Sequence, residues 1–342
     1  MDANPSCLGR RVDSWVARGW LCVAVLMVVC VGSAPARASF PGRNGAIVYA
    51  WTNANKEAGS PTSLRAVDPR SGRVRTLLDC PLRTAAPTTY PDCSVLTPRY
   101  SPDGLRIAFS VFHHAYPPDG PWGSWAGLGL MTSEGTGVAD HPRADAYWRL
   151  AWSPTGDRLL VERGVTPGGS GGAAIFLASL DGTELSQVTP EWTRAPDWSS
   201  TGWIAFDRVR TDAGCFPRCE DIWVMLPGGD PRRVTYRGGY SPSWSPRGRR
   251  LAFVRRVRPE HPDIYLVGAD GSGLRRLTRR GGHSPAWSPD GKWIAFIRDG
   301  DVYVVRTTGG GLRRLVDELG PDEAYGLGPQ VGSLDWQPLG RR

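Results

Sequence analysis

One stretch of the chain carries the residue pattern of a hydrolase nucleophile. Residues 168–172 read Gly-Gly-Ser-Gly-Gly and fit the Gly-x-Ser-x-Gly pattern, in which the serine attacks from a strained turn between a strand and a helix. Here the pattern follows Pro167 in a glycine-rich segment between two predicted strands, which gives Ser170 no such turn. We therefore interpret the match as accidental and predict no catalytic residue.

Histidines could bind a metal ion, since neutral imidazole is a common metal ligand. The chain has five, at His113, His114, His141, His261 and His283. Distance along the chain does not by itself prevent them from meeting at one site. However, neighbouring side chains in an extended segment point in opposite directions, so His113 and His114 could not both bind one ion without a kink. We predict neither a metal site nor a cofactor.

Seven cysteines are present, and four of them, Cys80, Cys93, Cys215 and Cys219, lie beyond residue 38. Four cysteines in an exported chain indicate two disulfides, for which three pairings are possible. Closeness in the sequence favours Cys80–Cys93 and Cys215–Cys219. The alternative is a four-cysteine metal site, which the wide separation of the two pairs and an oxidising compartment both disfavour.

The N-terminal residues set the expected compartment. Arg10, Arg11 and Arg18 precede an apolar run over residues 20–31, and Ala36-Arg37-Ala38 offers a small-x-small cleavage site. This arrangement is typical of a secretory signal peptide and too short for a stable membrane span. We predict a signal segment over residues 1–38 and a single folded domain over residues 39–342, with no transmembrane segment in the mature chain. Lipid attachment at Cys30 and an uncleaved anchor are the alternatives.

The elements that must position any site are predicted from a phrase that occurs five times: an aromatic residue, Ser, usually Pro, any residue, then Gly. The copies begin at Tyr100, Trp152, Trp198, Trp244 and Trp287, and successive copies are 52, 46, 46 and 43 residues apart. Each is followed by a short apolar strand, a loop, a third strand and a glycine-containing hairpin. A period of roughly 40–50 residues with several short strands predicts the blades of a β-propeller.

The two ends of the chain complete the count of blades. Residues 45–49 read as a second strand with no first strand before them, and residues 334–338 read as a first strand with no second strand after them. The C-terminal segment then supplies the inner strand of the N-terminal blade, which leaves no free sheet edge there. The predicted fold is all-β: a six-bladed β-propeller of four-stranded antiparallel blades, closed by the C-terminal strand.

The repeat also resembles a known family. Trp-Ser-Pro-Asp-Gly at residues 287–291, with Ile-Ala-Phe at 294–296 and Arg-Leu-Thr at 276–278, is similar to the WD-repeat-like repeats of TolB and its relatives. The resemblance covers about residues 40–338 and implies the propeller fold. It implies little about function, because such repeats also occur in peptidase propeller domains and polysaccharide lyases. The α/β domain that precedes the propeller in TolB is not expected here.

Connection lengths indicate which face of the propeller binds a partner. First-to-second and third-to-fourth connections share one face, the tight-turn face, and are uniformly short. Second-to-third connections and blade crossings share the other, the loop-rich face, and contain nearly all long insertions, among them residues 111–126 and 255–262. Elaborated loops on a rigid scaffold are typical of binding surfaces, and exposed Trp with Arg suits a protein or a sugar polymer. The candidate partner-binding residues on this face are His113, His114, Trp122, Trp125, Arg255, Arg256 and Arg258.

Charge is compatible with an anionic partner. The formal net charge is +8, and removal of residues 1–38, which contain four Arg and two Asp, leaves +6. We predict a secreted, periplasmic or envelope-associated monomer without catalytic activity that binds a protein or an anionic envelope polymer such as a polysaccharide. A metal-dependent polysaccharide lyase and a purely structural envelope component are the alternatives. No nucleic-acid recognition motif is present, so nucleic acid is not an expected partner.

Overall fold

The computed structural model describes most of the chain from Phe40 onward. The described residues are 40–52, 62–80, 92–115, 123–143, 147–165, 172–210, 220–258, 261–317 and 333–340. All of them belong to one compact unit that runs from Pro35 to Arg342. The predicted signal segment lies outside the described residues, and so do Ser170, Trp122, Cys215 and Cys219.

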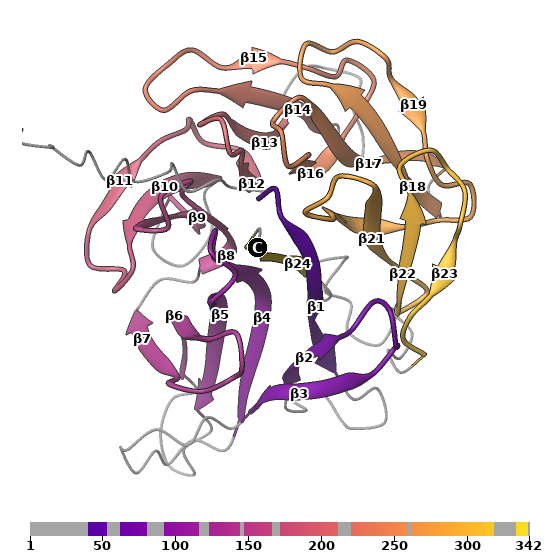
Figure 1. The fold of residues 1–342 in the computed structure, drawn as a ribbon. Coiled ribbons are helices and arrows are strands. Elements are labelled where there is room, and N and C mark those ends of the chain that lie inside the picture. Colours follow the sequence, from indigo (N-terminus) through magenta and orange to yellow (C-terminus); the bar gives the residue numbers. More distant parts are fainter. Residues whose placement is uncertain are drawn as a thin grey trace, which may run out of the picture. The chain divides into compact units, whose positions relative to one another are not determined.

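Six four-stranded antiparallel sheets form the blades of a propeller within this unit (Figure 1). Blade 1 contains β24 (Leu334–Leu339), β1 (Arg43–Thr52), β2 (Thr62–Val67) and β3 (Val74–Asp79). Blade 2 contains β4 (Asp92–Tyr100), β5 (Arg106–Ala115), β6 (Gly123–Thr132) and β7 (Ala139–Arg143). Blade 3 contains β8 (Tyr147–Trp152), β9 (Arg158–Gly164), β10 (Ala173–Ser179) and β11 (Leu185–Gln187).

The remaining three blades follow the same order of strands, and the predicted all-β, six-bladed architecture is therefore confirmed. Blade 4 contains β12 (Thr193–Trp198), β13 (Ile204–Val209), β14 (Glu220–Met225) and β15 (Arg232–Arg233). Blade 5 contains β16 (Tyr240–Trp244), β17 (Arg250–Arg258), β18 (His261–Gly268) and β19 (Arg275–Arg276). Blade 6 contains β20 (His283–Trp287), β21 (Trp293–Arg298), β22 (Asp301–Arg306) and β23 (Arg313–Arg314).

The repeated Ser-Pro-x-Gly phrase forms the turn between the first and second strands of blades 2 to 6. In blade 2, the Ser101 hydroxyl accepts a hydrogen bond from the Arg106 N–H at 2.9 Å, and the Gly104 N–H donates to the Ser101 carbonyl at 2.8 Å. The turn requires a positive φ at its glycine, which is 72° at Gly104 and 64–89° at the glycines of the other four turns. The role of the phrase is therefore structural, because it forms the turn between two strands.

Blade 1 closes the ring as the sequence predicts. β24 pairs antiparallel with β1, with Trp336 opposite Ile47 and Leu334 opposite Tyr49. The Trp336 indole is buried, and its Nε1 donates a hydrogen bond to the Gly45 carbonyl at 3.1 Å. The last strand of the described chain therefore completes the first blade.

A disulfide joins Cys80 to Cys93, with their Cα atoms 5.6 Å apart. Cys80 directly follows the outermost strand of blade 1, and Cys93 lies in β4, the innermost strand of blade 2. The bond therefore spans the crossing from one blade to the next.

The hydrophobic core lies in the layers between neighbouring blades. One aromatic ring from the second strand of five blades is fully buried there: Tyr49, Phe109, Phe206, Phe253 and Phe296. In the layer that closes the ring, Tyr49 and Trp336 of blade 1 pack with Val302 and Val304 of blade 6. Burial of side chains of this size stabilises the fold by roughly 1.5–3 kcal/mol each.

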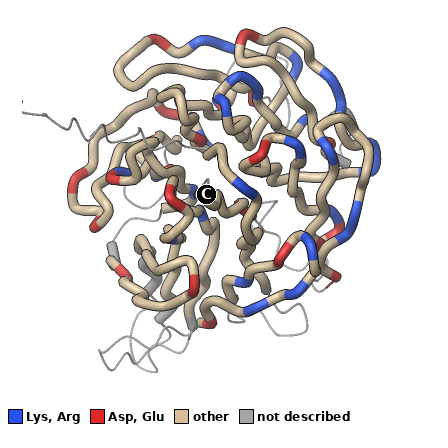
Figure 2. The backbone as a smooth tube through the Cα atoms, in the orientation of Figure 1, with Lys and Arg blue, Asp and Glu red and all other residues tan. Residues whose placement is uncertain are grey.

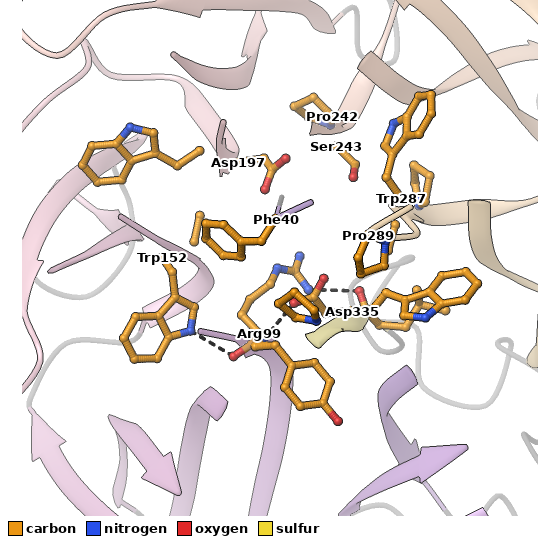
Figure 3. A pocket seen from close by; sticks show the side chains of 17 residues that line it. Phe40, Arg99, Trp152, Asp197, Pro242, Ser243, Trp287, Pro289 and Asp335 are labelled. Carbon is orange, nitrogen blue, oxygen red and sulfur yellow. Dashed lines mark hydrogen bonds between the residues drawn. The ribbon is translucent and has the colours of Figure 1, made fainter. Parts of the chain in front are cut away.

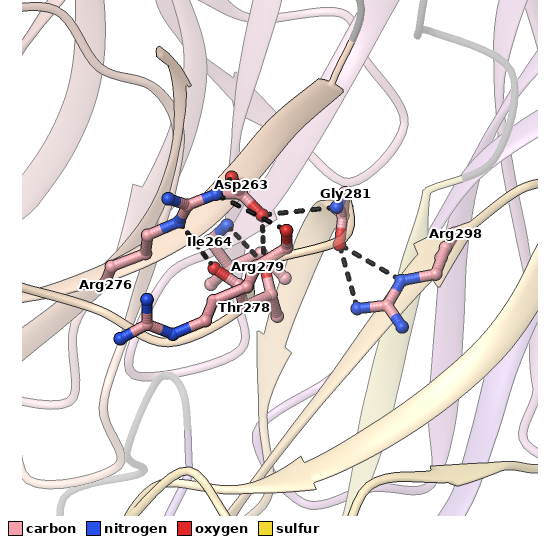
Figure 4. A network of polar contacts seen from close by, with 7 residues as sticks. All are labelled: Asp263, Ile264, Arg276, Thr278, Arg279, Gly281 and Arg298. Atoms are coloured by element: carbon pink, nitrogen blue, oxygen red, sulfur yellow. Dashed lines mark hydrogen bonds and ion pairs between the residues drawn. The ribbon is translucent and has the colours of Figure 1, made fainter. Parts of the chain in front are cut away.

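A charged network repeats in the outer halves of blades 4, 5 and 6. In blade 5, the buried Asp263 carboxylate pairs with the Arg276 guanidinium and accepts hydrogen bonds from Thr278 Oγ1 at 3.1 Å and the Gly281 N–H at 3.2 Å (Figure 4). The equivalent ion pairs are Arg233–Asp221 at 2.5 Å and Arg314–Asp301 at 2.8 Å. In each of these blades an aspartate of the third strand and an arginine of the fourth strand thus join the two strands.

Candidate functional site

The predicted partner residues of blade 2 lie in a hairpin. The sequence predicts a loop over residues 111–126, but β5 and β6 continue through most of it. His113 is paired opposite Trp125, and His114 opposite Ser124. The loop prediction was wrong here because a strand ladder is built from backbone N–H and C=O groups, which polar residues also supply.

The His113 side chain has a partner within its own blade. Its Nε2 lies 2.8 Å from Asp140 Oδ2 on β7, and both side chains are largely buried. This contact ties the second strand of blade 2 to the fourth across the hairpin. His113 therefore supports the hairpin, whereas Trp122 lies outside the described residues.

The predicted partner residues of blade 5 lie on β17, which continues to Arg258 and pairs with β18. The Arg255 guanidinium lies over the Tyr265 ring at 5.5 Å, and that of Arg256 lies over the Tyr240 ring at 4.9 Å. Arg255 is half-buried and Arg256 is exposed. Of these two, Arg256 is the more accessible to solvent.

Arg255 belongs to a pattern that the other blades share. Arginines on the second strands of blades 3 to 6 each lie over an aromatic ring of the third strand: Arg163 over Phe176, Arg208 over Trp223, Arg255 over Tyr265 and Arg298 over Tyr303, at 5.1–5.5 Å. Such a contact contributes roughly 0.5–2 kcal/mol. The arginine spacing in the sequence therefore reports blade packing as well as surface charge.

The two hairpins lie in different parts of the ring. β5 and β6 belong to blade 2, whereas β17 and β18 belong to blade 5, three blades away (Figure 1). The structure does not bring His113 and Arg256 into contact. They remain two separate sets of residues on hairpins that extend in the same direction from the scaffold.

The innermost strands enclose a second candidate site, a cavity of about 50 Å³ in the channel (Figure 3). Its polar groups are Arg99 of β4, Asp197 of β12, Ser243 of β16 and Asp335 of β24, and the Phe40 ring points into their midst. Aromatic and proline side chains complete the lining: Trp152, Trp287 and Pro289 come from the repeated phrase, and Pro242 comes from β16.

The channel carboxylates already have backbone partners. Asp335 Oδ2 accepts a hydrogen bond from the Tyr100 N–H at 2.8 Å, and Asp197 Oδ2 accepts one from the Trp244 N–H at 2.5 Å. Burial raises the pKa of Asp335, while the positive charge of Arg99 and the amide hydrogen bond oppose that rise. Each carboxylate therefore joins an inner strand to the inner strand of the next blade.

A second layer of buried carboxylates lies on the second strands. The inner strands of blades 2 to 6 each contain a bulge, and Ala195 and Ser241 adopt positive φ values of 50° and 51° at two of these bulges. The Ala195 N–H donates to Glu162 Oε2, and the Ser241 N–H donates to Asp207 Oδ2, both at 2.9 Å. The carboxylates thus stabilise strained backbone in the following blade.

Burial of Asp207 disfavours the charged form of its carboxyl group. Burial raises its pKa to about 6, partly offset by the nearby Arg149 and by the hydrogen bond from Ser241. Arg149 lies closer to the other carboxylate, with Nη1 at 3.5 Å from Glu162 Oε2. Sequence reasoning missed these groups, although an isolated Glu or Asp after the apolar core of a second strand is a usable signal.

No cluster of three or more His, Cys, Asp or Glu side chains suited to a metal ion is found among the described residues. The turn residues Asp103 and Asp290 instead accept hydrogen bonds from Ser101 and Ser288 within their own turns, at 2.5 and 2.6 Å. Within the same part of the chain, the structure contains no helix with the length and apolar character that a membrane crossing requires.

Solved structures resemble this arrangement of blades, although no protein-family model and no curated protein sequence matches the chain. TolB from Acinetobacter baumannii superposes with a TM-score of 0.62 at 18% identity, over 86% of this chain and 67% of that one. A putative TolB from Agrobacterium tumefaciens gives 0.54 at 19% identity, over 82% and 91%. The fold is a TolB-like β-propeller.

The TolB-like propeller also resembles part of a larger enzyme. A puromycin-hydrolyzing peptidase from Mycobacterium tuberculosis superposes with a TM-score of 0.53 at 18% identity, over 84% of this chain and 58% of that protein. At such identities the likeness concerns the fold alone, because one fold serves many functions. The function of this TolB-like chain must therefore be argued from its own surfaces.

Proposed function

We propose that this protein is exported and, without catalysis, binds a protein or an anionic envelope polymer through its loop-rich face. The unequal length of the second-to-third hairpins carries the proposal. β5 and β6 contain 10 residues each, and β17 and β18 contain 9 and 8, whereas both strands of these hairpins contain 6 in blades 4 and 6. The two longer hairpins extend the loop-rich face on opposite sides of the channel.

These longer hairpins carry the candidate partner residues. His113, His114 and Trp125 lie on one, and Arg256 and Arg258 lie on the other. An aromatic residue and arginines are enriched where proteins contact their partners. A partner that touches both hairpins has to span the ring, which suits a protein or a polymer better than a metabolite.

The small size of the channel cavity favours binding on a face of the propeller over binding inside the channel. Its cavity of about 50 Å³ is far below the roughly 300–1,000 Å³ of typical small-molecule pockets. Phe40 and the tryptophans occupy the space, and the carboxylates of Asp197 and Asp335 already accept backbone hydrogen bonds. A ligand of more than a few atoms would have to displace these groups.

Export rests on two independent features. The sequence predicts a signal segment over residues 1–38, and the Cys80–Cys93 disulfide suits an oxidising compartment such as the periplasm or the cell exterior. Cytosolic proteins are kept reduced, so a bond between two blades would rarely persist there.

Paired substitutions test the loop-rich face. Envelope extract is passed over the immobilised mature protein, over Trp122→Ala with Trp125→Ala, and over Arg256→Ala with Arg258→Ala. Arg255 is left unchanged because its side chain is half-buried, whereas that of Arg256 is exposed. We expect both variants to lose the retained material while their melting temperatures stay within a few degrees of the native value.

The matched control is Arg247→Ala with Arg249→Ala, which removes two exposed charges from the tight-turn face of blade 5. It should retain the material that the native protein retains. Treatment of the extract with protease distinguishes a protein from a polymer. If both hairpin variants bind as the native protein does, the proposal is wrong.

A further inference from the structure

A second and larger cavity lies at the tight-turn end of blade 1, on the face opposite the proposed partner surface. Its volume is about 640 Å³. The start of β1, the end of β24 and the connection between β2 and β3 line it. A cavity of this size falls within the range of roughly 300–1,000 Å³ that small-ligand sites occupy.

The way in which the ring closes explains why blade 1 is open here. In blades 2 to 6 a Ser-Pro-x-Gly or Ser-Ser-x-Gly turn links the first strand to the second at this end. In blade 1 those strands are β24 and β1, and no such turn connects them. Their ends remain paired, with Arg43 opposite Leu339, and side-chain contacts add to this pairing: Arg43 Nε donates to the Gly340 carbonyl at 3.4 Å and the Ala46 N–H donates to Gln337 Oε1 at 3.3 Å.

Four arginines line this cavity: Arg43, Arg70, Arg73 and Arg75. All four are exposed, and β23, the outermost strand of the neighbouring blade 6, consists of two further arginines, Arg313 and Arg314 (Figure 2). Asp68 is the one acidic residue among those that line it. No aromatic side chain is among the described residues of the lining, so sugar stacking is not the chemistry of this site.

The charged side chains that line the cavity differ in their hydrogen-bond and ion-pair partners. Asp68 Oδ1 accepts hydrogen bonds from the Ser71 N–H at 3.0 Å and the Arg70 N–H at 2.7 Å, which hold the pKa of Asp68 below its usual value. Arg75 pairs with Glu134 of blade 2. The guanidinium groups of Arg70 and Arg73 form no hydrogen bond or ion pair with the described part of the chain.

We propose that this cavity binds an oligoanion, a molecule with at least two closely spaced phosphate or carboxylate groups. Guanidinium groups present a planar fork of donors that matches both kinds of oxyanion, often with two hydrogen bonds at once. Arg70 and Arg73 supply two such forks three residues apart, and Arg43 adds a third charge from the other wall. This site does not depend on the partner surface proposed above.

Two probes test the site by isothermal titration calorimetry with the mature protein in 50 mM salt: inorganic tripolyphosphate and trigalacturonate. We expect at least one of them to bind. Arg70→Gln with Arg73→Gln should weaken that binding at least tenfold, and Arg70→Lys with Arg73→Lys should weaken it less, because the charge is kept and the fork is lost. The probe that binds identifies the oxyanion as phosphate or carboxylate.

The matched control removes the same charge from the same face at a blade whose turn is closed. Arg247→Gln with Arg249→Gln should change binding less than twofold, and so should the Trp122 and Trp125 substitutions on the opposite face. The inference fails if neither probe binds, or if the control weakens binding as much as Arg70→Gln with Arg73→Gln does, since that result indicates general charge attraction.

Discussion

Buried carboxylates occur in two regions of this propeller, and they hold different parts of it together. Asp221, Asp263 and Asp301, in the outer halves of blades 4 to 6, each pair with an arginine of the same blade. Nearer the channel, Asp207 and its counterparts accept backbone N–H groups of the following blade. The outer carboxylates therefore stabilise single blades, and the inner ones join neighbouring blades.

The difference lies in how the charge is compensated. An outer carboxylate such as Asp263 has a guanidinium partner, a hydroxyl donor and an amide donor. Asp207 has one amide donor and an arginine that lies nearer to another carboxylate. Removal of an outer carboxylate leaves a cation without its partner, whereas neutralisation of Asp207 removes a charge that burial penalises.

The largest effect is expected from removal of a whole inner strand. Deletion of residues 333–342 removes β24 and with it the buried Trp336 and the carboxylate of Asp335. Loss of a buried tryptophan side chain alone costs roughly 3–5 kcal/mol, and the exposed edge of β1 invites aggregation. Thermal unfolding and light scattering should show collapse of stability. A chain that ends at Gly340 is the control, and an unchanged melting curve for the larger deletion contradicts the composite blade.

The next effect should come from the outer network. Asp263→Ala leaves Arg276 without its carboxylate partner and Thr278 and Gly281 without an acceptor. Breaking a buried pair in this way costs roughly 3–5 kcal/mol, toward the lower end here because Arg276 is partly exposed. Chemical denaturation measures the change in the free energy of unfolding.

Asp270→Ala is the matched control for that experiment. Asp270 is an exposed aspartate of the same hairpin, and its carboxylate accepts hydrogen bonds from Ser272 within the turn. Its loss should cost less than about 1 kcal/mol. Equal losses for Asp263→Ala and Asp270→Ala would mean that the outer network does not stabilise the blade beyond its turn.

The third prediction concerns how the stability of the protein depends on pH through Asp207. Its pKa is raised to about 6 from 3.8, so the folded protein keeps a proton that the unfolded chain releases between these values. The contribution of Asp207 to stability therefore falls as pH rises through this window, by up to roughly 3 kcal/mol. Asp207→Asn should equal the native protein in stability at pH 4 and exceed it at pH 7.

The measurement is the difference in unfolding free energy between the two proteins across pH 4 to 7, which cancels the titration of other groups. Asparagine keeps a side-chain oxygen that can accept the Ser241 N–H. A variant that is less stable than the native protein at pH 7 would show that the charge of Asp207 is compensated as well as that of Asp263.

The fold was predictable from the sequence because each repeat forms its turn through interactions between residues that are close in the sequence. The Ser101 and Gly104 positions specify a turn, and their recurrence fixes the number and length of the blades. The same logic predicted that residues 334–338 complete blade 1. The ends of β5 and β17 were not predicted, because strands continue wherever backbone partners remain, and side-chain patterns report only burial.

The candidate sites were less predictable, since their polar groups do not recur. Asp335 and Asp197 precede the aromatic residue of their strands, but Ala151 and Ala286 take that place in blades 3 and 6. A position that changes from blade to blade carries no repeat signal. The open cavity of blade 1 follows from the missing turn, which the sequence shows, but the arrangement of Arg70 and Arg73 around it requires the structure.

The smallest effect concerns arginines that also join neighbouring blades, from the outer edge. Arg232 of blade 4 donates from Nη2 to the Ala269 carbonyl of blade 5, and Arg313 of blade 6 donates from Nη2 to the Pro69 carbonyl of blade 1. Arg232 is exposed, so the net contribution of this hydrogen bond is expected to be about 0.5–1 kcal/mol. Arg232→Gln should lower the free energy of unfolding by that amount, whereas Arg237→Gln, at an exposed neighbouring position without such a contact in the described part, should change it less. If the two variants are equal, blades are joined by the inner carboxylates and the core, and the outer edge adds nothing to that joining.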